Sequence, residues 1–174
     1  MAKPFYVYIA TVFGLGFFTK MPGTVGSFVA LILNLLVKIP LWAIILVSVI
    51  GIYTSSLTED FLKSADPKNY PEIPERYFHI TDPSCAIIDE VAGMWVSAYL
   101  LPGQFLVPAF FLFRLVDILK PWPVSTMEKL PRGWGIMFDD ILGGIIVNIF
   151  LQIVNAYIYH AGWLYELVIK FTGA

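Results

Sequence analysis

Charged side chains are scarce in this sequence. Asp, Glu, Lys and Arg make up 14% of its 174 residues, whereas hydrophobic residues make up 58%. A water-soluble domain carries about 25% charged residues. The composition therefore favours a membrane protein. The alternative is a very apolar, soluble helical protein that buries its apolar faces in an oligomer. The formal net charge is −2. No basic excess is present to neutralise a phosphate backbone, so nucleic acid is not an expected partner.

Cysteine and histidine are scarce as well. The single cysteine, Cys85, excludes an intrachain disulfide framework. No arginine follows Cys85 within a few residues, so the phosphate-binding loop of a cysteine phosphatase is absent. Cys85, His79 and His160 are scattered and do not form a group of the zinc-binding type.

Long apolar stretches, separated by proline or glycine, fill most of the chain. Runs without alternation predict helices, and they occur over residues 5–18, 25–37, 41–57, 86–101, 105–119 and 136–159, with a short amphipathic helix expected over 162–171. A full bilayer span needs roughly 20 residues, and only the run over 136–159 reaches this length alone. We therefore expect one all-α domain over residues 1–174, a compact membrane-embedded helical bundle with several short helices.

The ionisable residues fall at the ends of these apolar runs. The loop over residues 120–132 contains Lys120, Lys129 and Arg132 against Glu128, so the positive-inside rule places it in the cytoplasm. If the short helices alternate in direction from that loop, the remaining polar groups gather at the same cytoplasmic end. These groups are Glu59, Asp60, Asp89, Glu90, Arg114, Asp117, Asp139, Asp140 and the turn over residues 23–27.

Several carboxylates in one apolar place would repel each other unless a cation lay among them. Ligands that are all oxygen suit a hard divalent cation, Mg²⁺ or Mn²⁺. Acidic residues at helix N-termini are also favoured by the helix dipole, which explains one acidic pair more easily than two. Gly93, Gly143 and Gly144 follow the acidic pairs by about one turn. They indicate either close helix packing or room for a substrate.

Several residues near the acids are suited to hold a phosphate. Arg114 and Asp117 share a helix face, either as a local salt bridge or with Arg114 on a phosphate and Asp117 on a metal. The turn containing Thr24 and Ser27 precedes an apolar run and is either a phosphate site at a helix N-terminus or a simple cap. It lacks the Gly-Lys-Ser/Thr of a Walker loop. Lys120 is either a second cation for phosphate or an interfacial anchor, and the Trp and Tyr residues suit interfacial anchoring.

Four blocks of sequence resemble one known family. They are PGTVGS (22–27), AIIDEVAGMW (86–95), FRLVDILKPWPV (113–124) and GWGIMFDDILGGI (133–145). In this order and together, they resemble the phosphatidylglycerophosphatase A family. The connection between Asp60 and Asp89 is longer than in the enteric members of the family, with an added region at 71–74. This departure puts the segment that covers the site in doubt, but not the core motifs.

The resemblance implies a Mg²⁺-dependent lipid phosphatase of the bacterial inner membrane, with its site facing the cytoplasm. Such an enzyme removes the terminal phosphate of phosphatidylglycerophosphate to give phosphatidylglycerol, although soluble relatives share the fold. By this resemblance the metal ligands would come from Asp60, Asp89, Glu90, Asp117, Asp139 and Asp140. Thr24, Ser27, Arg114 and Lys120 would bind the phosphate. Glu90, Asp139 and Asp140 would be catalytic, by direct attack of water or through an aspartyl-phosphate.

Two other functions are compatible with carboxylates in apolar helices. A phosphotransferase acting on a CDP-lipid needs an Asp-Gly…Ala-Arg pattern followed by spaced aspartates, and the sequence does not contain it. A membrane carrier with a carboxylate cation site would place its acids near the middle of the span, whereas here they fall at one end. A homo-oligomer is compatible with all three functions.

Overall fold

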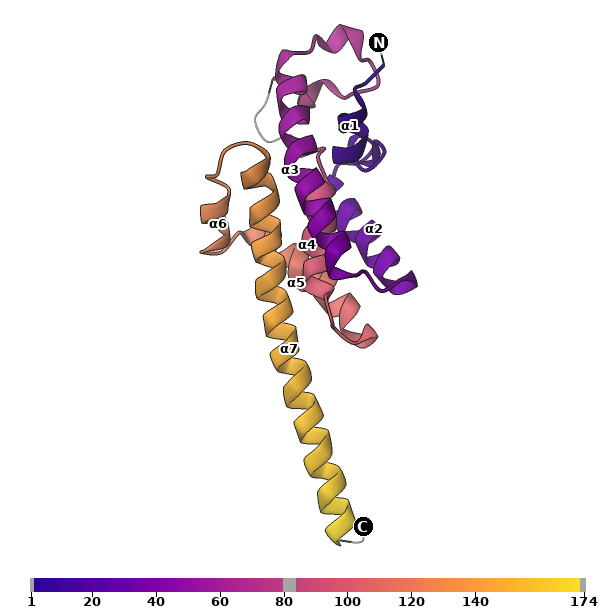
Figure 1. Ribbon diagram of the computed structural model, residues 1–174, viewed down its shortest axis with the longest axis vertical. Helices are drawn as coiled ribbons and strands as arrows, with labels where there is room; N and C mark the ends of the chain where they lie inside the picture. Colours follow the sequence, from indigo (N-terminus) through magenta and orange to yellow (C-terminus); the bar gives the residue numbers. More distant parts are fainter. Residues whose placement is uncertain (1, 80–83, 173–174) are drawn as a thin grey trace.

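The computed structural model describes residues 2–79 and 84–172, and side chains as far as His160. Within these residues the protein is helical and contains no strand, which confirms the all-α fold (Figure 1). The α-helices are α1 (Phe5–Ala10), α2 (Pro22–Leu36), α3 (Leu41–Ser64), α4 (Ile88–Ala98), α5 (Leu106–Leu119), α6 (Val124–Met127) and α7 (Gly133–Thr172). Short 3₁₀ turns lie at Leu15–Phe17, Pro67–Asn69, Glu75–Tyr77 and Gly103–Phe105.

Proline and left-handed residues set several helix boundaries. Helix α2 begins at Pro22, three residues before the expected start, because proline is well suited to the first helical position. Helix α3 follows Pro40 and runs to Ser64. Helix α5 ends at Lys120, whose φ of 42° is left-handed and breaks the helix. The backbone turn at Lys120 then leads into α6.

Helix α4 lies at the centre of the bundle. It packs against α2, α3, α5 and α7, and most of its side chains are buried. The main core gathers around it from α2, α5 and α7, and its fully buried members include Met94 and Phe113. Because α4 carries Asp89 and Glu90 in its first turn, these carboxylates are held by the most buried helix of the protein.

The stretch between Asp60 and Asp89 was expected to be a polar connection, but its first part is helical. Helix α3 continues through residues 58–64, and two 3₁₀ turns follow before the undescribed residues 80–83. Val7, Leu62, Tyr77 and Cys85 form a second core that fixes this region to α1 and to the end of α3. The region caps one end of the bundle (Figure 1).

Helices α3 and α7 are long and apolar enough to cross a membrane. The candidate spans are Leu41–Ser64 and Gly133–His160, with mean hydropathy 1.8 and 1.9, and most of their residues are not buried inside the protein. Helix α7 runs without a break to Thr172 and extends beyond the other helices (Figure 1). The separate helix expected over 162–171 was therefore wrong, and its expected amphipathic side chains lie outside the described part of the chain.

Candidate active site

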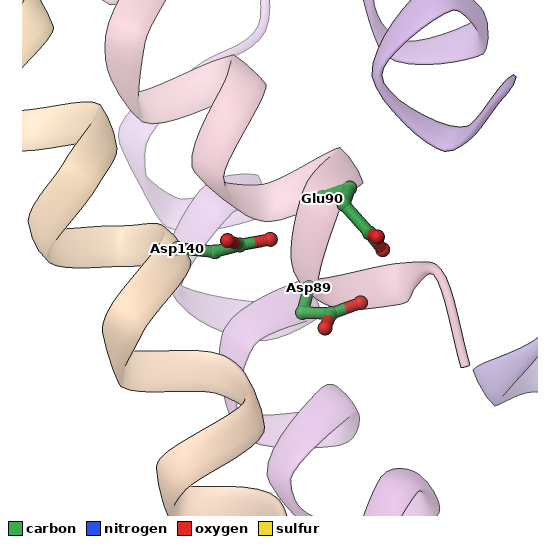
Figure 2. A group of neighbouring side chains, drawn as sticks. All are labelled: Asp89, Glu90 and Asp140. Atoms are coloured by element: carbon green, nitrogen blue, oxygen red, sulfur yellow. The ribbon is translucent and has the colours of Figure 1, made fainter. Parts of the chain in front are cut away.

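Three carboxylates from two helices meet near one end of the bundle. Asp89 and Glu90 come from the first turn of α4, and Asp140 comes from the second turn of α7 (Figure 2). One oxygen from each of the three lies within 4.8 Å of the others. Asp89 and Asp140 are buried. The arrangement brings together the two acidic pairs that lie about 50 residues apart in the sequence.

Gly93 allows α7 to approach α4 at this point. A Cβ atom at Gly93 would lie 2.6 Å from Cζ of Phe113 and 2.8 Å from the carbonyl oxygen of Asp140. Any larger residue would push the backbone of Asp140 away from α4. The packing interpretation of this glycine is therefore confirmed, and the packing serves the site because it sets the separation of the carboxylates.

A small pocket of about 140 Å³ opens beside the three carboxylates. Its lining consists of Ser84, Ala86, Asp89, Glu90, Asp117, Lys120, Ile136, Asp139 and Asp140. A larger cavity of about 520 Å³ lies where α2 ends and α5 begins, but no carboxylate lines it. The small pocket is therefore the one with the functional groups for catalysis.

The carboxylates are poorly compensated by the protein itself. Oε2 of Glu90 and Oδ2 of Asp140 are buried and have no hydrogen-bond partner. Burial, together with the nearby charges of Asp140 and Asp117, raises the pKa of Glu90 to about 8. A buried polar atom without a partner is costly, and a divalent cation would remove that cost. The oxygen ligand set fits Mg²⁺ or Mn²⁺.

Lys120 connects Asp139 to the loop after α6. Its Nζ donates to Oδ2 of Asp139 at 2.7 Å and to Oε1 of Glu128 at 2.5 Å. Burial disfavours the charged ammonium, but these two hydrogen bonds outweigh it and raise the pKa of Lys120. Oδ1 of Asp139 accepts the backbone N–H of Asp140 at 3.0 Å. The two neighbouring aspartates thus have different surroundings, since Asp139 pairs with Lys120 whereas Asp140 faces α4.

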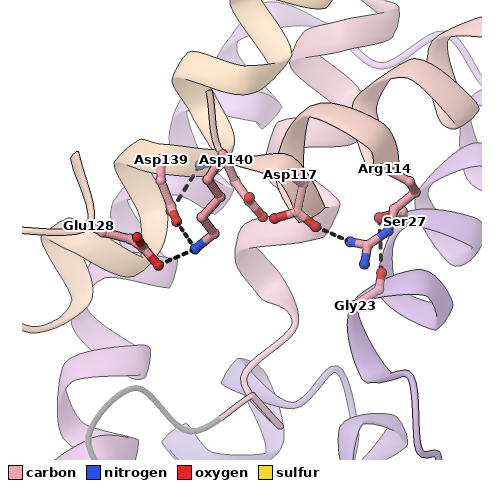
Figure 3. Close-up of polar contacts among 8 residues, drawn as sticks. Gly23, Ser27, Arg114, Asp117, Glu128, Asp139 and Asp140 are labelled. Carbon is pink, nitrogen blue, oxygen red and sulfur yellow. Dashed lines mark hydrogen bonds and ion pairs between the residues drawn. The ribbon is translucent and has the colours of Figure 1, made fainter. Parts of the chain in front are cut away.

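Arg114 and the start of α2 close the other side of the cluster. Nη1 of Arg114 lies 2.5 Å from Oδ2 of Asp117, so the salt bridge expected from their spacing is confirmed (Figure 3). Asp117 also lines the pocket. A Cβ atom at Gly23 would overlap Oε1 of Glu90 and lie 2.9 Å from Nη1 of Arg114. The first turn of α2, with its free backbone N–H groups, therefore reaches the acidic cluster.

Four of the expected site residues do not line the pocket, and one of them, Arg114, contacts it through Asp117. The hydroxyl of Ser27 is buried and donates to the carbonyl of Gly23 at 2.9 Å. Thr24 is half-buried on the same helix. Asp60 is exposed and lies 3.4 Å from Arg132 in an ion pair. The pocket instead gains Ser84, Ala86 and Ile136, and Glu128 acts on it through Lys120. The signal for Glu128 was present, because it is the one acid in the basic loop over 120–132.

Sequence comparison shows which known proteins this chain resembles. The family model described as Phosphatidylglycerophosphatase A matches residues 8–155. A Bacteroides thetaiotaomicron protein named "Putative phosphatidylinositol-3-phosphatase" is 30% identical over 172 residues, covering 89% of this chain and 98% of the relative. Two relatives are named "Phosphatidylglycerophosphatase A". The Escherichia coli protein is 29% identical, covering 84% of this chain and 80% of the relative. The Haemophilus influenzae protein is 33% identical, covering 79% of this chain and 80% of the relative.

No solved structure matches the chain significantly. The family model covers most of the chain, including every residue of the pocket described above. The family match therefore spans the whole stretch of sequence that forms the pocket. The relatives named as phosphatidylglycerophosphatases hydrolyse a phosphoric monoester, as their names state. The chain belongs to the phosphatidylglycerophosphatase A family and is a phosphoric monoester hydrolase.

Proposed function

We propose that this protein hydrolyses phosphatidylglycerophosphate to phosphatidylglycerol and inorganic phosphate, with Mg²⁺ as its cofactor. The observation that carries the proposal is the meeting of Asp89, Glu90 and Asp140 in a pocket that also contains Lys120. An acidic metal site beside a cation suits a phosphomonoester dianion. Family membership supports a hydrolase over the two alternatives, a CDP-lipid phosphotransferase and a membrane carrier.

The residues divide into three roles. Asp89, Glu90 and Asp140 would hold the metal, with Asp117 and Asp139 in the same pocket. A divalent ion held there would supply Lewis-acid chemistry, polarising the phosphoryl oxygens and lowering the pKa of water. Lys120 faces the pocket and would bind a phosphate oxygen, and Arg114 adds positive charge from the side of α2.

Glu90 is our candidate for the group that accepts a proton from the attacking water. If one of its oxygens holds the metal, the other can still accept a proton, and burial raises the pKa of this carboxyl to about 8 in the metal-free protein. A general base works best when its pKa lies near the operating pH. Asp139 is less suited to this role, because its two oxygens already accept hydrogen bonds from Lys120 and from the backbone of Asp140.

A second substrate has support from one relative. The Bacteroides thetaiotaomicron protein, named as a phosphatidylinositol-3-phosphatase, is similar to this chain over nearly its whole length. Both lipids present a phosphomonoester, and a pocket of about 140 Å³ has little room beyond the phosphate itself. The alcohol of the headgroup would therefore be selected outside the pocket, so we carry a phosphoinositide as the second candidate substrate.

We further propose that the protein acts as one domain in the bacterial inner membrane, with the pocket facing the cytoplasm. Helices α3 and α7 supply the two candidate spans. The loop between α5 and α7 is basic, with Lys120, Lys129 and Arg132 against Glu128, which favours the cytoplasmic side. Lys120 joins that loop directly to the pocket.

The test is phosphate release from the two lipids by the purified full-length protein, with and without Mg²⁺. We expect Mg²⁺-dependent release, faster from phosphatidylglycerophosphate, and its loss in Asp140→Asn. Asp60→Asn is the matched control, because Asp60 lies outside the pocket, and it should keep its activity. Metal-independent release, or full activity in folded Asp140→Asn, would contradict the proposal. Faster release from the phosphoinositide would make that lipid the substrate.

A further inference from the structure

Large apolar side chains stand exposed beside the pocket. Leu119, Trp122, Leu130 and Trp134 are 66%, 81%, 40% and 51% exposed. They come from the end of α5, the loops on either side of α6 and the start of α7. We call these four residues the apolar shoulder. A soluble protein rarely leaves such side chains together in water without a binding role.

Contacts of Lys120 and of the Leu130 backbone connect the apolar shoulder to the rim of the pocket. Lys120 follows Leu119 and contacts both Asp139 and Glu128. A Cβ atom at Gly135 would lie 2.6 Å from the carbonyl oxygen of Leu130, which places that loop against α7. Figure 3 shows the carboxylates of Glu128 and Asp139 side by side. In the sequence, each of the four apolar residues lies within two positions of a residue that lines or supports the pocket, namely Lys120, Glu128 or Ile136.

The size of the pocket indicates a role for the apolar shoulder in lipid binding. A volume of about 140 Å³, lined mainly by carboxylates and Lys120, suits a phosphate and excludes acyl chains. A lipid with its phosphate in this pocket must therefore place its glycerol and acyl chains outside. Apolar surface at the rim is where those parts can lie without being exposed to water.

The apolar surface continues from the shoulder along two helices. Leu115 and Ile118 of α5 are exposed, as are Ile145, Ile149 and Ile153 of α7, which follow one another at every fourth position and so share one face. Helices α5 and α7 pack against each other. The shoulder thus adjoins the outward faces of α5 and of a candidate membrane span.

The composition of the shoulder favours a lipid surface as its occupant. Trp122 and Trp134 flank, in the sequence, a stretch that contains exposed Lys129 and Arg132. Tryptophan with nearby basic residues is typical of the boundary between headgroups and acyl chains, and the basic residues complement anionic lipid phosphates. A second copy of this chain would gain little from that combination of charges.

We propose that the apolar shoulder lies in the headgroup region of the bilayer and is the side from which a lipid phosphate reaches the pocket. The inference rests on the proposed lipid phosphatase function and names the part of the surface that receives the lipid. It assigns Trp122 a role in lipid contact rather than in chemistry. The occupant is the bilayer itself, with the substrate among its lipids.

The single cysteine makes a direct test feasible. Cys85 is fully buried, and burial raises the pKa of its thiol to about 12, so it will not react with a thiol reagent near neutral pH. Trp122→Cys can therefore carry a spin label in the full-length protein. Leu119→Cys is the second position in case Trp122→Cys folds poorly. Lys68→Cys, exposed in a 3₁₀ turn of the cap, and Ile153→Cys on α7 are the references.

The measurement compares the rates at which each spin label collides with oxygen, which concentrates in the bilayer, and with a polar nickel complex, which stays in water. The protein is placed in vesicles of mixed zwitterionic and anionic phospholipids. We expect labels at 122 and 119 to collide more with oxygen, as at 153, and the label at 68 to collide more with nickel. If the labels at 122 and 119 collided more with nickel while the label at 153 collided more with oxygen, the inference about the apolar shoulder would be overturned. The membrane proposal would remain. If the label at 153 also collided more with nickel than with oxygen, the membrane proposal would be contradicted. Spin–spin broadening at 122 would show a second copy there and overturn the inference.

Phosphatase activity provides an independent test of the inference. Trp122→Ala should lower kcat/KM about tenfold for a long-chain lipid phosphate in vesicles, because one buried indole is lost from the lipid contact. The same variant should hydrolyse a short-chain, water-soluble lipid phosphate at the wild-type rate. Trp42→Ala is the matched control, since Trp42 is also largely exposed, at 68%, but lies at the start of α3. Equal loss on both substrates would show that Trp122 supports the pocket and overturn the inference.

Discussion

Gly144 of α7 packs directly against the carbonyl oxygen of Gly93 in α4, so closely that a Cβ atom at Gly144 would overlap it. Gly93 in turn leaves no room for a side chain between Phe113 and the backbone of Asp140. The two glycines therefore set the distance between α4 and α7. That distance decides whether Asp140 can join Asp89 and Glu90 around one ion.

Substitution of Gly144 should therefore weaken both the fold and the site. We expect Gly144→Ala to destabilise the protein by about 1–3 kcal/mol through overpacking. Phosphate release should fall at least about tenfold, because a small displacement of catalytic groups is costly. Thermal unfolding and phosphate release measure the two effects. Gly103→Ala, where no atom lies within 4 Å, should change neither. Wild-type behaviour of Gly144→Ala would mean that the helices tolerate a wider separation.

Removal of one carboxylate should have opposite effects on the metal-free and metal-bound protein. In the absence of metal, we expect Asp140→Asn to raise the melting temperature, because Oδ2 of Asp140 is buried among like charges without a partner. Mg²⁺ at 100 times its Kd should stabilise the wild type by about 2.7 kcal/mol and should stabilise Asp140→Asn much less. Thermal unfolding over a Mg²⁺ titration checks both effects. Equal Mg²⁺ stabilisation of the two proteins would place the ion elsewhere.

Lys120 should matter through its proposed contact with the phosphate and through Asp139, and much less through Glu128. Lys120→Met removes the cation proposed to bind the phosphate and leaves the buried carboxylate of Asp139 without its partner, so we expect kcat/KM to fall by about 100-fold. Glu128→Gln removes only the more exposed contact and should cost about threefold or less. Steady-state kinetics on both variants gives the comparison. Similar losses in the two would show that the link to the loop matters more than the charge on Asp139.

Much of the site was predictable because short helices alternate in direction. The apolar runs fixed where each helix lies, and alternation brought Asp89 and Glu90 to the same end as Asp140. Asp60 was expected in that group, but α3 continues to Ser64 as a regular helix. Successive residues on a helix point about 100° apart, so Glu59 faces inward while Asp60 faces solvent. Because a loop was expected after residue 57, the opposite orientations of Glu59 and Asp60 were not predicted from the sequence.

Side-chain partners were less predictable than helix positions. Ser27 was expected in a turn, but α2 already begins at Pro22, so its hydroxyl bonds back to Gly23 one turn earlier. The partners of Lys120 depend on the left-handed backbone at that residue, which directs the chain into α6 and brings Glu128 within reach. Residue spacing alone does not contain either piece of information.

The pKa of Glu90 predicts how stability depends on pH. Burial and neighbouring carboxylates raise this pKa from 4.5 to about 8 in the folded, metal-free protein. Between these values the folded state keeps a proton that the unfolded state releases, so the free energy of unfolding should fall as the pH rises toward 8. Glu90→Gln removes the titrating group and should flatten this dependence.

Mg²⁺ should reverse the trend, because it binds the ionised carboxylate and competes with the proton. We therefore expect the stabilisation by Mg²⁺ to grow from pH 5 to pH 8 in the wild type and to change less in Glu90→Gln. Thermal unfolding across this range, with and without Mg²⁺, measures both slopes. If the metal-free wild type instead gained stability as the pH rose, Glu90 would be ionised in the folded protein. Glu90 would then be an unsuitable proton acceptor at neutral pH, and Asp139 or Asp140 would take its place.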